Sequence, residues 1–355
     1  MMDQATSVRS GEALDVASLT TYLQQHFGPS VGSVRIQQFP SGYSNLTYLV
    51  STSSQEYVLR RPPMGQYAPQ AHDMEREYRV LSLLKPVYDA VPTPVLYCEA
   101  TNIIGAPFYL MERVPGVILR GSASGEKVSP AQMQALSERA VDHLVQLHAL
   151  DTETTGLSEL GHPVGYVSRQ VDGWIKRYRR AETDSIPAMS EVMEWLPEHL
   201  PPELPRPALI HNDYKYDNLV LNPDNLAEII AVLDWEMATV GDPLMDLGTT
   251  LGYWAEADDH PALRPFNLTW REGNLNREAV AQRYAERSGY DLDHLVFYYV
   301  FGCFKIGVIA QQIYARYQQG HTRDERFAGL IHVVKACAQN AQRALTLNRI
   351  SNLNR

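Results

Sequence analysis

The chain has 355 residues, of which 45% are hydrophobic and 20% are charged, so it can bury a sizeable core in about two domains or lobes. Its 31 basic and 41 acidic residues give a net charge of −10, which argues against a nucleic-acid-binding surface. Three cysteines lack metal-binding spacing and are expected in the core: Cys98, Cys303 and Cys337.

No opening Arg-rich or apolar segment resembles a signal or transit peptide. The longest apolar stretch, residues 295–310, is interrupted by Lys305 and is too short to span a bilayer. We therefore expect a cytoplasmic protein that does not associate with membranes.

The N-terminal segment, residues 1–33, is expected to contain a disordered tail over residues 1–11 and then a helix. Asp15 can cap this helix, and Gly28 ends it. The helix has apolar residues on one face: Leu19, Leu23 and Phe27.

Three strands are predicted next, over residues 34–39, 46–52 and 56–60. The turn between the first two contains Gly and hydroxyl residues that could bind the phosphates of a nucleotide, although an ordinary hairpin turn is the alternative. The candidate phosphate-binding residues in this turn are Ser41, Gly42, Ser44 and Asn45.

Arg60 ends the third strand, where a guanidinium can bind phosphate oxygens in a bidentate manner. Arg61 is the neighbouring candidate, but strand alternation directs it to the other face. A helix is predicted over residues 70–84, and its Glu77 is expected to pair with Arg60, with Glu75 as the alternative.

A further strand, residues 107–111, leads into the sequence ERVPG, which is typical of a hinge between two lobes. The backbone from Met111 to Arg113 would then hydrogen-bond adenine, although a plain turn would have the same sequence. This hinge predicts a nucleotide-binding N-lobe over residues 34–114 and a C-lobe over residues 115–355.

After a polar loop at residues 121–125, the C-lobe is predicted to be mainly helical. The helices are expected near residues 129–148, 167–183, 195, 244–256, 277–287, 292–317 and 324–345. The helix over 167–183 has a basic face that is either solvated or forms a wall for an anionic substrate. The candidate substrate residues on it are Lys176 and Arg177.

The residues with the clearest chemistry lie between 208 and 248. His211-Asn212-Asp213 is followed by Asn218 with the spacing H-x-D-x-x-x-x-N, and an apolar run then ends at Asp234. Phosphoryl transfer needs a carboxylate that receives the acceptor's proton, which Asp213 can provide. Asn218 and Asp234 offer the oxygen ligands that Mg²⁺ prefers, and Lys215 could contact the transferring phosphate.

Asp246 is expected to anchor this loop by accepting backbone N–H bonds, which is a structural role. His148 is expected to be a structural histidine. Several aromatic residues could line an acceptor pocket, although core packing is the preferred interpretation. They are Tyr253, Trp254, Phe297, Tyr298 and Tyr299.

Seven stretches resemble, in order, the aminoglycoside phosphotransferase and choline-kinase-like family: SGYSN, YVLR, EREYRVL, YLMERVPG, HNDYKYDN, VLDWE and GDPLMDLG. The resemblance covers about residues 34–252. It is strongest to the phosphotransferase domain fused to some acyl-CoA dehydrogenases, on HNDYKYDNLVL and VLDWEMATVGDPLMDLG. It implies an α+β protein-kinase-like fold, with a small antiparallel N-lobe that contains one main helix and a larger, mainly helical C-lobe.

The resemblance also implies that ATP and Mg²⁺ bind between these lobes. Asp213 would be the catalytic base, Asn218 and Asp234 the metal ligands, and Glu236 an additional carboxylate beside the metal. Arg60 occupies the position of the family's phosphate-binding lysine, which is a departure from the pattern.

The substrate suggested by the closer resemblance is a hydroxyacyl-CoA or another small metabolite, with a functional link to an acyl-CoA dehydrogenase. An aminoglycoside kinase and a regulatory pseudokinase remain alternatives. A metal-dependent hydrolase would need a denser ligand set, and the chain has no G-x-x-x-x-G-K-[ST] motif of a P-loop enzyme.

Overall fold

The computed structural model describes residues 3–39, 45–64, 73–322 and 324–354. The chain divides into two compact units. Unit 1 comprises Met1–Val117, Val220–Pro223 and Ile230–Glu236. Unit 2 comprises Ile118–Leu219, Asp224–Ile229 and Met237–Arg355. Two short segments from the middle of the chain therefore belong to the N-terminal unit.

A five-stranded antiparallel sheet of order β1-β2-β3-β5-β4 forms the framework of unit 1. Its strands are β1 (Arg35–Gln38), β2 (Leu46–Ser51), β3 (Glu56–Arg61), β4 (Pro94–Cys98) and β5 (Phe108–Glu112). The first three match their predicted ranges to within one residue at each end. The sheet therefore fixes β3, and with it Arg60, between β2 and β5.

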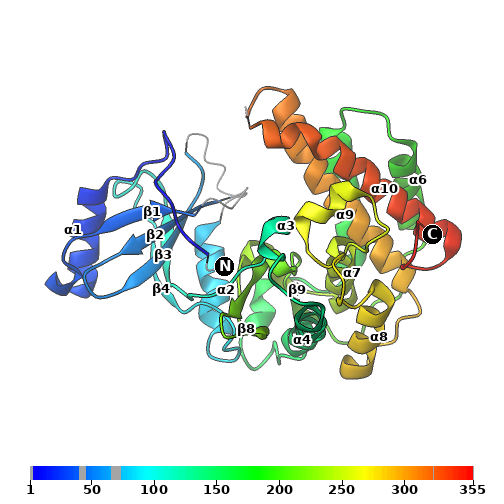
Figure 1. The fold of residues 1–355 in the computed structure, drawn as a ribbon, viewed down its shortest axis with the longest axis horizontal. Helices are drawn as coiled ribbons and strands as arrows, with labels where there is room; N and C mark the ends of the chain where they lie inside the picture. Colours follow the sequence, from blue (N-terminus) through cyan, green and yellow to red (C-terminus); the bar gives the residue numbers. More distant parts are fainter. Residues whose placement is uncertain (1–2, 40–44, 65–72, 323, 355) are drawn as a thin grey trace. The chain divides into compact units, whose positions relative to one another are not determined.

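One helix packs on each face of this sheet: α1 (Val16–Phe27) and α2 (Met74–Leu84) (Figure 1). Leu59 of β3 belongs to the hydrophobic cluster that includes residues of α1. Its neighbour Arg60 points to the other face because successive side chains alternate in a strand. Alternation therefore directs Arg60 toward α2.

The N-terminal residues contradict the prediction of a disordered tail. The N–H of Thr6 donates to the carbonyl of Gln38 at 2.8 Å, and the N–H of Gln38 donates back at 2.9 Å. The Arg9 N–H donates to the side-chain oxygen of Gln38 at 2.9 Å. Strand β1 lies at the edge of the sheet, so the backbone groups on its outer side have no partner strand. The N-terminal segment bonds to these groups at Gln38.

Unit 2 is mainly helical. Its longer helices are α4 (Pro130–His148), α5 (Tyr166–Ala181), α6 (Pro187–Glu198), α7 (Pro243–Tyr253), α8 (Arg277–Ser288), α9 (Leu295–Gln318) and α10 (Leu330–Leu347). The predicted polar loop at 121–125 instead contains a short helix, α3 (Gly121–Ser124). The last predicted helix begins later than expected, because a 3₁₀ turn (Glu325–Gly329) precedes α10.

Helix α9 lies among α5, α6, α7 and α10. Among the described residues it is the one helix long and apolar enough to cross a membrane, but 78% of its most apolar window is buried inside the structure. At 24 residues it is longer than the apolar stretch seen in the sequence. Its contact with α7 is so close that a Cβ on Gly302 would lie 2.0 Å from the carbonyl oxygen of Gly248.

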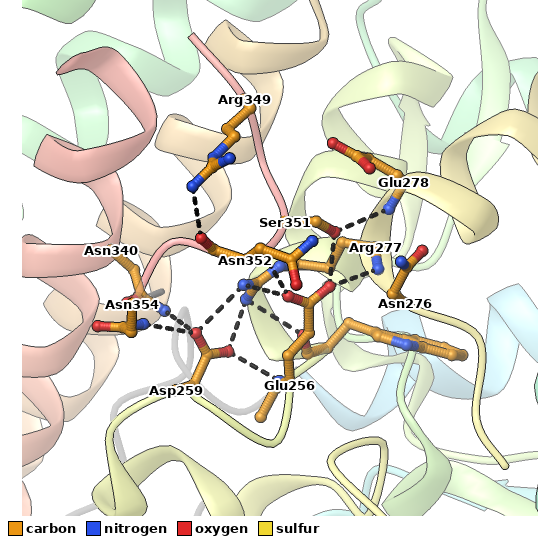
Figure 2. A network of polar contacts seen from close by, with 12 residues as sticks. Glu256, Asp259, Asn276, Arg277, Glu278, Asn340, Arg349, Ser351, Asn352 and Asn354 are labelled. Atoms are coloured by element: carbon orange, nitrogen blue, oxygen red, sulfur yellow. Dashed lines mark hydrogen bonds and ion pairs between the residues drawn. The ribbon is translucent and has the colours of Figure 1, made fainter. Parts of the chain in front are cut away.

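A buried ion-pair network fixes the C-terminal segment of unit 2 (Figure 2). Arg277, at the start of α8, bonds Asp259 at 2.7 Å and Glu256 at 3.2 Å. The Ser351 hydroxyl donates to Glu256 at 2.6 Å, and the Asn352 N–H donates to the same carboxylate at 2.9 Å. The network thereby connects the loop after α7 to the segment after α10.

Candidate active site

The H-x-D-x-x-x-x-N loop begins where β6 (Ala208–Ile210) ends, and β6 is paired with β9 (Thr239–Gly241). In this loop Lys215 Nζ lies 2.6 Å from Oδ2 of Asp213. Asn218 Nδ2 donates to the same oxygen and to the Asp213 carbonyl, both at 2.9 Å. Asp213 and Asn218, which the spacing selected, therefore form one hydrogen-bonded cluster with the neighbouring candidate Lys215.

Lys215 is held in its charged form. Burial alone would lower its pKa, but the Asp213 carboxylate beside it raises the pKa above the usual value. Its ammonium also lies 4.7 Å from the ring centroid of Tyr253. Burial raises the pKa of Tyr253, and the Asp213 charge adds to this effect. Asp213 is thus bordered by a cation and a neutral phenol.

Asp246 of α7 anchors the loop, as predicted. Its two carboxylate oxygens accept the backbone N–H groups of His211 and Asn212, each at 2.7 Å. Burial opposes its charge, but hydrogen bonds from His148 and His211 outweigh burial and lower the pKa of Asp246. His148 contacts Asp246 at 3.1 Å and the Tyr284 hydroxyl at 2.7 Å, which agrees with a structural role.

Asn212 adopts an unusual backbone conformation, with φ +67°. Its side-chain Nδ2 donates to the Tyr166 hydroxyl and to the Met237 carbonyl, both at 3.2 Å. Lys305 of α9 donates to the Asn212 carbonyl at 2.8 Å. None of these three partners was predicted from the sequence, because each is distant along the chain. The one signal for Lys305 was its charge inside an apolar stretch.

Arg60 forms ion pairs with carboxylates from two other segments of unit 1. Its guanidinium bonds Glu77 at 2.7 Å and Asp234 at 3.1 Å. The predicted Arg60–Glu77 pair is therefore present, while the alternative Glu75 is exposed. Burial raises the pKa of Glu77, which Arg60 opposes. Arg61 faces the other way and donates to the Ile104 carbonyl at 2.7 Å.

The carboxylates of unit 1 lie beside Arg60. Glu236 Oε2 lies 3.8 Å from the guanidinium and accepts the amide N–H of Asn45 at 2.8 Å. Asp234 has a left-handed backbone, with φ +67°. The other predicted residues of the phosphate-binding turn, Ser41, Gly42 and Ser44, lie outside the described residues.

The predicted metal ligands have a suitable chemistry for Mg²⁺, although the described residues contain no group of three or more His, Cys, Asp or Glu side chains that could hold a metal. Asp234 offers a carboxylate. The side-chain nitrogen of Asn218 donates to Asp213, so its side-chain oxygen is the atom that could bind a metal. A carboxylate oxygen and an amide oxygen are each the kind of hard ligand that Mg²⁺ prefers.

The predicted hinge lies at the end of β5. Met111 pairs with Val58 in the sheet. The N–H of Glu112 donates to the Thr93 carbonyl at 2.9 Å, and that of Arg113 donates to the Glu56 carbonyl at 3.4 Å. The Arg113 side chain also forms an ion pair with Glu56.

The basic face of α5 is exposed to solvent, and it includes the candidate substrate residues Lys176 and Arg177. The Arg177 guanidinium lies 4.7 Å from the ring centroid of Trp174. The aromatic residues proposed as either pocket or core are buried: Tyr253, Trp254, Phe297, Tyr298 and Tyr299. Core packing therefore accounts for most of them.

A model of the phosphotransferase enzyme family matches residues 35–289. The chain belongs to this phosphotransferase family. The match includes both the Arg60 cluster and the Asp213 loop.

Two mammalian proteins are similar to this chain over most of its length. Acyl-CoA dehydrogenase family member 11 of Rattus norvegicus is 39% identical over 88% of the chain, and family member 10 of Mus musculus is 38% identical over 87%. The chain spans only 41% and 29% of these two proteins, respectively.

Solved structures confirm the expected kinase-like fold class. A Ralstonia eutropha protein assigned to the aminoglycoside phosphotransferases has a TM-score of 0.79 and 30% identity, with 94% of this chain and 99% of that chain covered. A macrolide 2'-phosphotransferase has a TM-score of 0.61 and 18% identity over 93% of this chain and 99% of that chain. At that identity the second likeness shows the fold alone.

Proposed function

We propose that this chain is an ATP- and Mg²⁺-dependent phosphotransferase that transfers the γ-phosphoryl group to a hydroxyl of a small molecule. The observation that carries the proposal is the environment of Asp213, which contacts Lys215 at 2.6 Å and Asn218 at 2.9 Å in a loop anchored by Asp246. A carboxylate fixed in this way can orient an acceptor hydroxyl and receive its proton.

The residues of unit 1 have the complementary role in this proposal. Arg60 binds phosphate oxygens, and its ion pair with Glu77 holds the guanidinium in place. Asp234 and Asn218 would hold Mg²⁺, with Glu236 as an additional carboxylate. The metal supplies positive charge that neutralises phosphate oxygens as the phosphoryl group is transferred.

A hydroxyacyl-CoA is the proposed acceptor class. The exposed basic residues Lys176 and Arg177 of α5 would attract the CoA phosphates in a chain whose net charge is −10. The names of the mammalian relatives supply a second argument, since those longer proteins are acyl-CoA dehydrogenase family members. A functional link to such a dehydrogenase belongs to the same proposal.

The first test measures ATP consumption with Mg²⁺ across hydroxyacyl-CoAs, aminoglycosides, choline and sugars. Turnover on one class that falls sharply in Asp213→Asn supports the proposal and names the acceptor. Asp217→Asn is the matched control, because Asp217 lies in the same loop but bonds Arg120 at 3.0 Å. ATP binding without turnover on any acceptor would instead support a pseudokinase, and no ATP binding would refute the proposal.

The acceptor class is tested by charge. Neutralising Lys176 and Arg177 should raise KM for a hydroxyacyl-CoA while KM for ATP stays unchanged. Lys335→Ala, at an exposed site on α10, controls for the loss of net charge. An unchanged acceptor KM in the double variant would contradict the proposed CoA site, and preferential turnover of an aminoglycoside would assign the acceptor to that class.

A further inference from the structure

Lys305 is a buried lysine in the middle of α9, where its residue is only 1% exposed. Its neighbours along the helix are apolar, and lysine is rarely buried so deeply without a partner. Among the described residues, no ion pair within 4.0 Å joins its ammonium to a carboxylate. An ordinary buried ion pair therefore does not explain this residue.

The ammonium instead bonds one residue of the catalytic loop twice. Lys305 Nζ donates to the Asn212 carbonyl oxygen at 2.8 Å and to its side-chain oxygen at 3.1 Å. A lysine ammonium has three donors, so one group can serve both oxygens. A side chain of α9 thus bonds the residue that immediately precedes Asp213.

The bonded carbonyl belongs to the peptide group that joins Asn212 to Asp213. The N–H of that same peptide group donates to Nδ1 of His211 at 3.2 Å. Both polar atoms of the peptide plane are therefore occupied, one from α9 and one from within the loop. Because a peptide group is planar, fixing both atoms fixes the direction in which the backbone enters Asp213.

Holding a charge at this position is unfavourable for the fold. Burial lowers the pKa of Lys305 to about 8, although the carboxylates of Asp246 and Asp213 favour its charged form. The ammonium also lies 5.7 Å from the ring centroid of Trp174, which offers weak additional stabilisation. Burying the Lys305 charge reduces the stability of the fold, so we infer that its presence is explained by its contact with the loop.

We propose that Lys305 is a positioning residue, whose two bonds to Asn212 set the orientation of the Asp213 carboxylate. The inference rests on the proposed role of Asp213 as the base. Lys305 itself is too deeply buried to touch an acceptor, so it acts through Asn212.

The test compares Lys305→Met with Gln311→Met. Methionine fills much of the volume of each side chain without donating a hydrogen bond. Gln311 is a matched control, because it is buried on the same helix but donates to the Ala181 carbonyl at 2.8 Å and to Thr183 at 2.9 Å. Lys305→Met should lower kcat on the order of 10²-fold with KM for ATP unchanged, and Gln311→Met should leave both constants nearly unchanged.

A second arm asks whether Lys305 acts through Asp213. In an Asp213→Asn background, Lys305→Met should lower the residual kcat by less than about 3-fold, because residues that act as a unit are not additive. An equal loss in both backgrounds would show that Lys305 has a general structural effect and would overturn the proposal.

Amide hydrogen exchange separates this inference from the proposed function. Lys305→Met should speed exchange in a peptide covering residues 208–218, while Gln311→Met should not. If the wild type has no phosphotransferase activity but this difference is present, the proposed function fails while the contact by which Lys305 orders the Asp213 loop stands. Unchanged exchange in Lys305→Met would overturn the positioning role.

Discussion

Lys215 and Asp213 form the shortest ion pair of the H-x-D-x-x-x-x-N loop, with 2.6 Å between Nζ and Oδ2. Both side chains are only 14% exposed, so water screens the pair weakly. The lysine fixes the carboxylate that we propose as the base, and we propose that its charge also contacts a transferring phosphate.

Lys215→Met should therefore lower kcat by about 10²-fold, because the carboxylate loses a donor and its fixed orientation. Steady-state kinetics on the acceptor that the panel identifies would measure the loss. Lys335→Met, an exposed site on α10, is the control and should behave like the wild type. A Lys215→Met enzyme with full kcat would exclude a role for this lysine in the reaction.

Arg60→Lys should raise KM for ATP at least 10-fold. The guanidinium bonds Glu77 and Asp234 simultaneously, and the compact ammonium of lysine cannot reproduce that planar arrangement. Arg61→Lys, on the opposite face of β3, should leave KM for ATP unchanged. Equal ATP affinity in Arg60→Lys and the wild type would show that charge alone suffices here.

Asp246→Asn should lower the free energy of unfolding by about 3 kcal/mol. The two carboxylate oxygens accept the N–H groups of His211 and Asn212, and in the variant the asparagine NH₂ group would face one of these N–H donors and repel it. Denaturant unfolding would measure the change. Asp172→Asn, at an exposed position on α5, should change stability by less than about 0.5 kcal/mol. A similar stability for both variants would contradict the anchoring role.

The stability of the protein should depend on pH through Lys305. Its pKa is about 8 when folded, against an ordinary 10.5, so the unfolded chain binds more protons between these values. The free energy of unfolding should therefore rise from pH 8 to 10.5, by an amount on the order of 3 kcal/mol.

The comparison with Lys305→Met isolates this effect from other titrating groups. Four charged side chains act on the ammonium: Asp246 from α7, Asp213 and Lys215 from the loop, and Arg177 from α5. All four remain in the variant. The wild type should therefore gain stability relative to Lys305→Met over this pH range, and parallel stability curves would contradict a depressed pKa.

The sequence predicted the elements whose signals are local. The three short strand candidates correspond to β1, β2 and β3, and the capping residues Asp15 and Ser129 lie at helix starts in the structure. The Arg60–Glu77 pair was predictable because a strand end and a helix face have few candidate charges. The loop spacing likewise identified Asp213, Lys215 and Asn218, since they are neighbours in sequence.

Contacts between distant segments were not predictable in the same way. Lys305 and Asn212 are 93 positions apart, and nothing in the composition of α9 indicates which residue its lysine contacts. Thr6 was missed because a short pairing with an edge strand has no periodicity of its own. In each case the contact depends on tertiary packing, which determines partners that local propensity cannot specify.

The close contact of Gly248 with Gly302 makes the spacing of α7 and α9 a property of the backbone, since no side chain separates them. Asp246 and Lys305 approach the same loop from these two helices. A methyl group at either glycine would push the helices apart and misalign both supports, without touching nucleotide or acceptor. Selections for new acceptor specificity should therefore retain this glycine pair even as acceptor-contacting residues change.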